Sequence, residues 1–231
     1  TAPAPSHVDE EICVGCEQCA ADCPYDAITM ITRPPGGRSE EVARVDPARC
    51  VSCGICAGSC APMGVGPPGR TGRDQLADAR TFAAAAERRA GEHVVICCDR
   101  GAERWGSALA AEGAAVLPVD CAGNLHTSVI ELFVRNGSAG VLVLACPPRD
   151  CWNREGPRWL SERVYEDREA ELQARVDRNR VRIGHAAAGE RAQAVEALQR
   201  FMRDTAALGM ASRDPGEVGA ECEPVESAVE P

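Results

Sequence analysis

The sequence predicts two domains of different class: an α+β domain over residues 9–70 and a doubly wound α/β domain over residues 92–208. Three observations lead to this division. Two compact cysteine runs lie in the first region, short apolar runs alternate with amphipathic stretches from Glu92 onward, and a chain of 231 residues has room for two small domains.

The segments that flank the first domain differ from it in amino-acid composition. Residues 1–8 are a Pro-rich lead-in. Residues 71–91 form a linker, and the Ala-rich stretch 74–90 with its mixed charges predicts a helix within it.

The second domain is expected to contain four strands, at 94–97, 115–121, 140–146 and 181–185, and four helices, at 107–112, 126–135, 159–180 and 190–207. The stretch 140–146 is apolar throughout, as in a parallel sheet that is covered on both faces. Residues 209–231 are polar and acidic and predict a disordered tail.

The composition excludes several classes of function. A formal net charge of −10 opposes nucleic-acid binding, which needs a basic surface. No stretch approaches 18 apolar residues, so no direct membrane span is expected. No signal peptide opens the sequence, and we therefore expect a cytoplasmic protein with reduced cysteines instead of a disulfide-stapled secreted one.

Eight of the 14 cysteines follow the spacing C-x₂-C-x₂-C-x₃-C twice. That spacing is typical of paired [4Fe–4S] clusters, in which the fourth cysteine of each run ligates the cluster of the other run. The implied ligand sets are Cys13, Cys16, Cys19 and Cys60 for one cluster, and Cys50, Cys53, Cys56 and Cys23 for the other. Structural zinc is the alternative, but zinc sites space their C-x₂-C pairs further apart.

The residues after the first run, Pro24 to Ile28, resemble bacterial dicluster ferredoxins, which implies a ferredoxin-like fold for residues 9–70. The second run departs from that pattern, because Ala61 separates Cys60 from the following proline.

Further cysteines end the predicted strands of the second domain: Cys97 or Cys98, Cys121 and Cys146, with Cys151 one short loop later. Parallel strands deliver their carboxyl ends to one edge of the sheet, where α/β folds place ligands. Four thiols there suit a [2Fe–2S] cluster or zinc, and the alternative is that these cysteines are simply buried apolar residues.

Residues 92–203 resemble the delta subunit of methyl-viologen-reducing hydrogenase, through Val95-Ile-Cys97, Val119-Asp-Cys121-Ala-Gly123 and the segment from Gly140 to Cys151. The resemblance implies a flavodoxin-like fold, a [2Fe–2S] cluster, and a complex with an FAD-containing, heterodisulfide-reductase-like subunit. The family often has Cys-x₂-Cys where this chain has Cys97-Cys98, and Cys97 is the preferred ligand because it aligns with the family's first cysteine.

Three functions compete. The first is a non-catalytic electron-transfer subunit that connects a flavoprotein with a catalytic oxidoreductase subunit. The second is an enzyme that reduces thiols or disulfides with cysteines of the α/β domain, and the third is an interaction module with structural zinc. Arg154, Arg158 and Arg163 are expected on a solvated helix face, and Trp152 and Trp159 are expected to pack.

Overall fold

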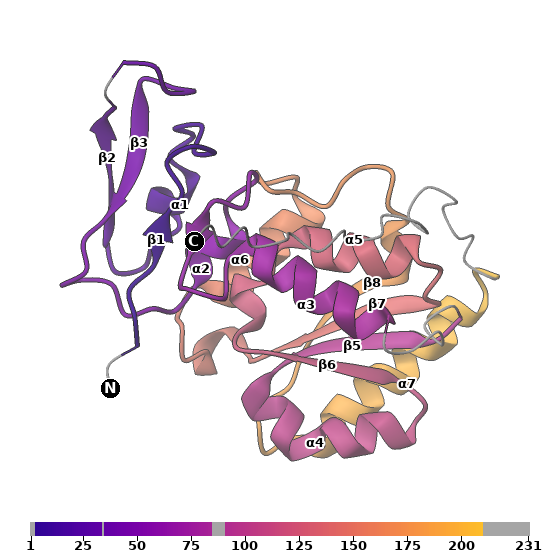
Figure 1. The fold of residues 1–231 in the computed structure, drawn as a ribbon. Coiled ribbons are helices and arrows are strands. Elements are labelled where there is room, and N and C mark those ends of the chain that lie inside the picture. The colour runs from indigo at the N-terminus through magenta and orange to yellow at the C-terminus, as the bar shows by residue number, and fades with distance from the viewer. Residues whose placement is uncertain (1–2, 34, 85–90, 210–231) are drawn as a thin grey trace, which may run out of the picture.

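The computed structural model describes residues 3–33, 35–84 and 91–209. The predicted tail beyond residue 209 and the end of the linker, residues 85–90, lie outside the described residues. The N-terminal part stands beside a larger α/β part (Figure 1).

The N-terminal part is built from two antiparallel strand pairs and two single-turn helices. Its elements are β1 (His7–Val8), α1 (Gln18–Ala21), β2 (Ile28–Thr32), β3 (Glu41–Val45), α2 (Ile55–Gly58) and β4 (Val65–Gly66). Strand β1 pairs with β4, and β2 pairs with β3. The lead-in prediction was therefore wrong for residues 7–8, which are a strand because β4 supplies the partner that the local sequence does not show.

The two cysteine runs form an internal repeat. Every cysteine of the second run lies 37 positions after its counterpart, as Cys50 does after Cys13. The two strand pairs show the same offset. Val8 pairs with Val65 in one of them, and the residues 37 positions away, Val45 and Ile28, pair with each other in the other. The N-terminal part therefore has approximate twofold symmetry, with one cysteine run in each half.

The C-terminal part contains a parallel sheet in the order β6-β5-β7-β8. Its strands are β5 (His93–Cys98), β6 (Ala115–Val119), β7 (Gly140–Ala145) and β8 (Val181–His185). All four were predicted, and a mixed α and β chain with a parallel sheet in its second part is confirmed.

Helices cover both faces of this sheet (Figure 1). Helices α3 (Gly72–Ala84) and α5 (Thr127–Arg135) lie on one face, and α4 (Asp99–Ala111) and α7 (Arg191–Ala206) lie on the other. The remaining elements are α6 (Gly156–Tyr165) and three short 3₁₀ turns, η1 (Ala122–Asn124), η2 (Pro148–Asp150) and η3 (Arg178–Arg180).

Two predicted helices have different bounds in the structure. Helix α4 begins at Asp99, directly after β5, well before the predicted start. Helix α6 ends at Tyr165, and the segment 166–177 leaves the helical path because tertiary contacts satisfy its backbone: the Thr127 hydroxyl donates to the Ala170 carbonyl, and the Gln173 N–H donates to the Glu131 carboxylate.

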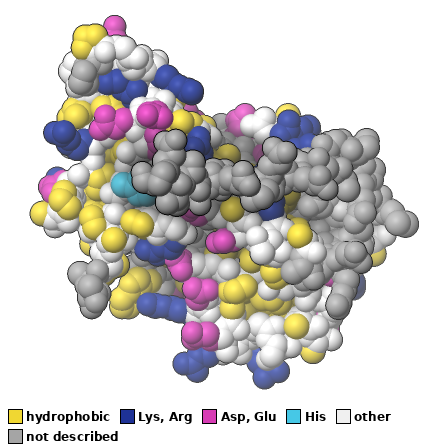
Figure 2. All heavy atoms as spheres, viewed as in Figure 1, with side chains coloured by type: hydrophobic (Ala, Val, Ile, Leu, Met, Phe, Trp, Pro, Cys, Tyr) yellow, Lys and Arg dark blue, Asp and Glu magenta, His cyan; other side chains and the backbone are white. Residues whose placement is uncertain are grey.

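Within the described part of the chain, no helix is both long enough and apolar enough to cross a bilayer. Acidic and basic side chains are interspersed on the face shown in Figure 2, so the net negative charge is not gathered into one field there.

Candidate metal centres

The first cavity lies inside the N-terminal part and is surrounded by thiols. Cys13, Cys16 and Cys19 of the first run line it together with Cys60 of the second. Val8 and Val65 of the pair β1–β4 add apolar walls to this cavity. The structure thus gathers the first of the two thiol sets that the spacing implied.

The second cavity repeats this arrangement in the other half. Cys50, Cys53 and Cys56 line the second cavity together with Cys23 of the first run. The fourth cysteine of each run lines the cavity of the other run, because a short helix, α1 or α2, carries the chain from one cavity to the other. Each cavity is therefore lined by three cysteines of one run and the fourth cysteine of the other.

The loops that carry the thiols are shaped by left-handed residues. Gly15 and its repeat mate Ser52 have φ of 69° and 61°, and Glu17 and its mate Gly54 have φ of 63° and 77°. Other segments direct backbone N–H groups at the sulfurs: the amides of Ser6, Ala27 and Gly64 donate to the sulfurs of Cys50, Cys23 and Cys60 at 3.2–3.3 Å. Such donors stabilise thiolates and tune the potential of bound iron–sulfur groups.

The protonation of these thiols is compatible with metal binding. Burial raises the pKa of Cys56 to about 12, and burial together with nearby Cys23 and Cys121 raises the pKa of Cys53 to about 11. Without a cation the buried thiols hold their protons, and a bound metal takes the place of those protons. The donor set, four thiols around one space with N–H groups directed at sulfur, fits a [4Fe–4S] cluster in each cavity.

Four more thiols meet at the carboxyl edge of the parallel sheet. Cys98 ends β5, Cys121 follows β6, Cys146 follows β7, and Cys151 follows η2. The Cys98 and Cys151 thiols each share hydrogen bonds with Cys121 and Cys146. These hydrogen bonds raise the pKa of Cys98 and Cys151, and they lower the pKa of Cys121 and Cys146. We call Cys98, Cys121, Cys146 and Cys151 the sheet-edge thiols.

Cys97 lies apart from the sheet-edge thiols, contrary to the preference stated from the sequence. Successive residues of a strand face opposite sides of the sheet. Val94, Ile96 and Cys98 face the side of α3 and α5, whereas Val95 and Cys97 face the side of α4 and α7. The preference is therefore revised to Cys98, whose sulfur also accepts a hydrogen bond from the Ala122 N–H at 3.2 Å.

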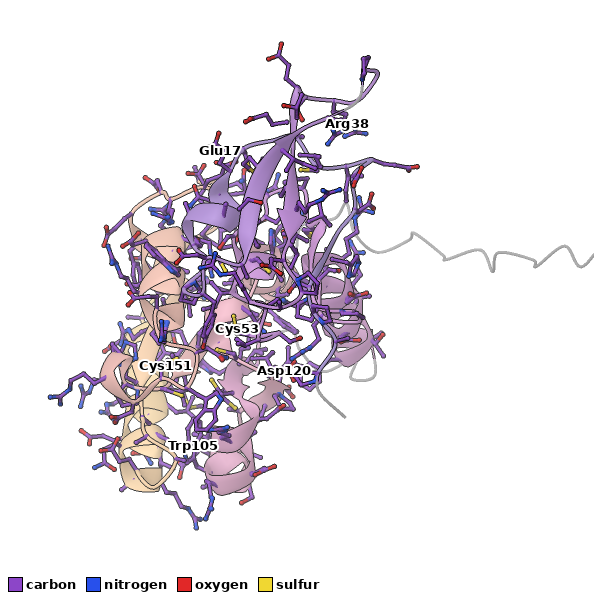
Figure 3. All side chains as sticks on the ribbon, turned by 90° about the vertical axis from the view of Figure 1, so that its left-hand side faces the viewer. Glu17, Arg38, Cys53, Trp105, Asp120 and Cys151 are labelled. Atoms are coloured by element: carbon purple, nitrogen blue, oxygen red, sulfur yellow. The ribbon has the colours of Figure 1, made fainter. Side chains whose placement is uncertain are left out.

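The second cavity is adjacent to the sheet-edge thiols. The Arg154 side chain, three residues after Cys151, donates to the Pro24 carbonyl at 3.0 Å and lies over the Tyr25 ring, and both of these residues line that cavity. Figure 3 shows Cys53 above and to the right of Cys151, on the side of the N-terminal part that faces the sheet edge. The three thiol groups therefore form a series, with the second cavity next to the sheet edge.

A close backbone crossing holds the sheet edge together. A Cβ on Gly123, two residues after Cys121, would lie 2.3 Å from Gly156 Cα at the start of α6. Only glycine allows η1 and α6 to approach so closely.

Replacing Gly123 by alanine is therefore expected to lower the free energy of unfolding by about 1–3 kcal/mol through overpacking, and to reduce metal retention at the sheet edge. Chemical denaturation and metal analysis measure the two effects. Gly189→Ala is the matched control, because its Cβ would meet nothing within 4 Å. An equally stable Gly123→Ala protein would show that the crossing is not required.

Three further residues have clear positions in the structure. Trp152 is 74% exposed and has the Arg100 guanidinium 4.3 Å from its ring centroid, so it is a surface residue and not a packing residue. His185 contacts the Cys146 carbonyl through Nδ1 at 3.0 Å. Arg163 is fully buried, and its expected place on a solvated helix face was wrong because residues of the N-terminal part cover α6 there.

No group of three or more His, Cys, Asp or Glu side chains among the described residues has the arrangement that would hold a metal ion. A [4Fe–4S] cluster is wider than one ion, and its ligands surround a space as the thiols of the two cavities do.

Comparison with known proteins agrees with this geometry. Residues 95–209 match the family described as methyl-viologen-reducing hydrogenase, delta subunit, and residues 12–64 match the 4Fe–4S dicluster domain. An uncharacterised polyferredoxin-like protein of Methanocaldococcus jannaschii is 37% identical over 65 residues, which cover 26% of this chain and 39% of that relative. The two-part resemblance predicted from the sequence is confirmed, and the matches support [4Fe–4S] sites and an iron–sulfur electron-transfer role.

Proposed function

Because residues 95–209 match the hydrogenase delta-subunit family and residues 12–64 match the dicluster domain, we propose that this chain is a non-catalytic electron-transfer subunit of a multi-subunit oxidoreductase. Its two parts are a dicluster ferredoxin-like domain, residues 9–70, and a flavodoxin-like domain, residues 92–208. The observation that carries the proposal is the series of three thiol groups, with the second cavity adjacent to the sheet edge.

The proposed cofactors are two [4Fe–4S] clusters in the cavities and one [2Fe–2S] cluster held by the sheet-edge thiols. When bound, such clusters take up and release single electrons. Iron is proposed over zinc at the sheet edge because of the family match, since four thiolates suit either metal.

The two ends of the series are open to solvent. Val14 is 43% exposed beside the first cavity, and Cys16, which lines that cavity, is itself exposed. At the other end, exposed Trp152 directly follows Cys151. These are the places where redox partners are proposed to approach, one of them an FAD-containing, heterodisulfide-reductase-like subunit in the cytoplasm.

Metal analysis after anaerobic purification tests the proposal. Two [4Fe–4S] clusters and one [2Fe–2S] cluster correspond to about ten iron atoms per chain. About eight iron atoms with alkylatable sheet-edge thiols and turnover on a disulfide would favour the thiol-reducing enzyme instead. About eight iron atoms with one zinc would favour the interaction module.

A second experiment tests the partner. Affinity purification of the full chain from its native cells should recover a subunit with bound FAD, and photoreduction of that flavin should bleach the iron–sulfur absorbance of this chain. A monomer at native abundance with its own turnover on a small substrate would contradict an electron-transfer subunit.

A further inference from the structure

Arg163 is a fully buried cation between the two parts of the chain. It belongs to α6 of the α/β part, and its side chain has no exposed surface. Its terminal nitrogens reach the Gly123 carbonyl at 3.0 Å, the Ser59 hydroxyl at 3.4 Å and the Asp22 carboxylate at 3.9 Å.

These partners belong to the segments that carry the thiols. Asp22 lies between Cys19 and Cys23, and Ser59 is its repeat mate, 37 positions later, between Cys56 and Cys60. The Ser59 hydroxyl donates to Asp22 Oδ2 at 2.5 Å, so the two equivalent crossing segments meet at this point.

The third partner belongs to the sheet edge. Gly123 lies two residues after Cys121, and a second, longer contact of 3.5 Å joins Arg163 to the Leu125 carbonyl. A Cβ on Gly58 in α2 would come within 2.7 Å of the same guanidinium nitrogen, so α2 passes close against the charge. One guanidinium therefore contacts chain segments that belong to all three thiol groups.

Solvent does not screen the charge of Arg163 from the thiols. Asp22 is also fully buried, and its other partner, Arg168, is only partly exposed. In an environment with little water, one charge acts over a longer range than it does at the surface. Arg163 stays protonated near neutral pH, since burial lowers its pKa only to about 10.

We propose that Arg163 is a positioning residue that sets the reduction potentials of the clusters and holds the N-terminal part against the sheet edge. The inference rests on the proposed function. A reduced cluster carries one more negative charge than an oxidised one, so a buried cation favours reduction and raises the potential. The Asp22 carboxylate, in the same network, is negative and therefore lowers the reduction potential.

Paired charge variants test this inference by redox titration of each cluster, followed by EPR. Arg163→Met should lower the potentials of both [4Fe–4S] clusters, and Asp22→Asn should raise them. Arg163→Lys keeps the charge and should leave the potentials close to those of the wild type. A purely structural role would not produce shifts of opposite sign.

Arg200→Met is the control, because Arg200 lies on α7, is exposed and pairs with the exposed Glu196 at the surface. Its loss should leave every potential unchanged. Unchanged potentials in an iron-replete Arg163→Met protein, or shifts of the same sign in both core variants, would overturn the inference.

If Arg163→Met does not retain iron, Asp22→Asn decides alone: a raised potential supports the inference, and an unchanged or lowered one overturns it. Wild-type protein without iron–sulfur clusters would instead contradict the proposed function.

Discussion

Replacing Cys98 by alanine is expected to remove about two iron atoms per chain and to abolish the EPR signal of the proposed [2Fe–2S] cluster. The Cys98 thiol hydrogen-bonds with those of Cys121 and Cys146, and without its sulfur the site has three ligands where the cluster needs four. Both [4Fe–4S] signals should remain, because their thiols line separate cavities. Iron analysis and low-temperature EPR of the reduced protein measure this.

Cys97→Ala is the adjacent control. Cys97 is fully buried on the α4 and α7 side of the sheet, so its replacement should cost stability of about 1 kcal/mol from lost apolar burial, but no iron. Cys146→Ala should reproduce the Cys98 result. If Cys97→Ala loses two irons and Cys98→Ala does not, the site is different from the one described.

Replacing Cys23 by alanine is expected to disrupt the cluster of the second cysteine run and to spare that of the first. Cys23 belongs to the first run by sequence, but its side chain lines the cavity of Cys50, Cys53 and Cys56. Loss of one ligand should release that cluster or convert it to a three-iron form. Because the second cavity lies next to the sheet edge, electron passage between the first cavity and the sheet-edge thiols should fall sharply as well.

Two reference variants show whether the fourth cysteine of each run ligates the cluster of the other run. Cys53→Ala marks the spectrum that lacks the second-cavity cluster, and Cys16→Ala marks the spectrum that lacks the first-cavity cluster. Cys23→Ala should match the former, and Cys60→Ala should match the latter. A Cys23→Ala spectrum identical to that of Cys16→Ala would show that each run binds its own cluster.

Sequence reasoning failed where a residue's surroundings come from distant parts of the chain. The run Val94-Val-Ile-Cys-Cys98 is apolar on both faces, so its pattern marks a buried strand but not which face each residue occupies. The choice between Cys97 and Cys98 therefore needed the positions of β6 and β7. Likewise, the charged stretch after Tyr165 has good helix formers, but contacts to α5 and to Asp22 draw it into a loop.

What the sequence determined by itself was local. The spacing of the two cysteine runs, the four strands of the parallel sheet and the C-terminal helix all follow from repeats and periodicities within short windows. The tertiary structure alone decided how these pieces meet. It brought Cys98 instead of Cys97 to the sheet edge, placed the second cavity beside it, and buried Arg163 at the point where the thiol-bearing segments converge. The physical reason is that burial and facing depend on which surfaces come together, and Arg163 is enclosed by residues more than 100 positions earlier in the chain.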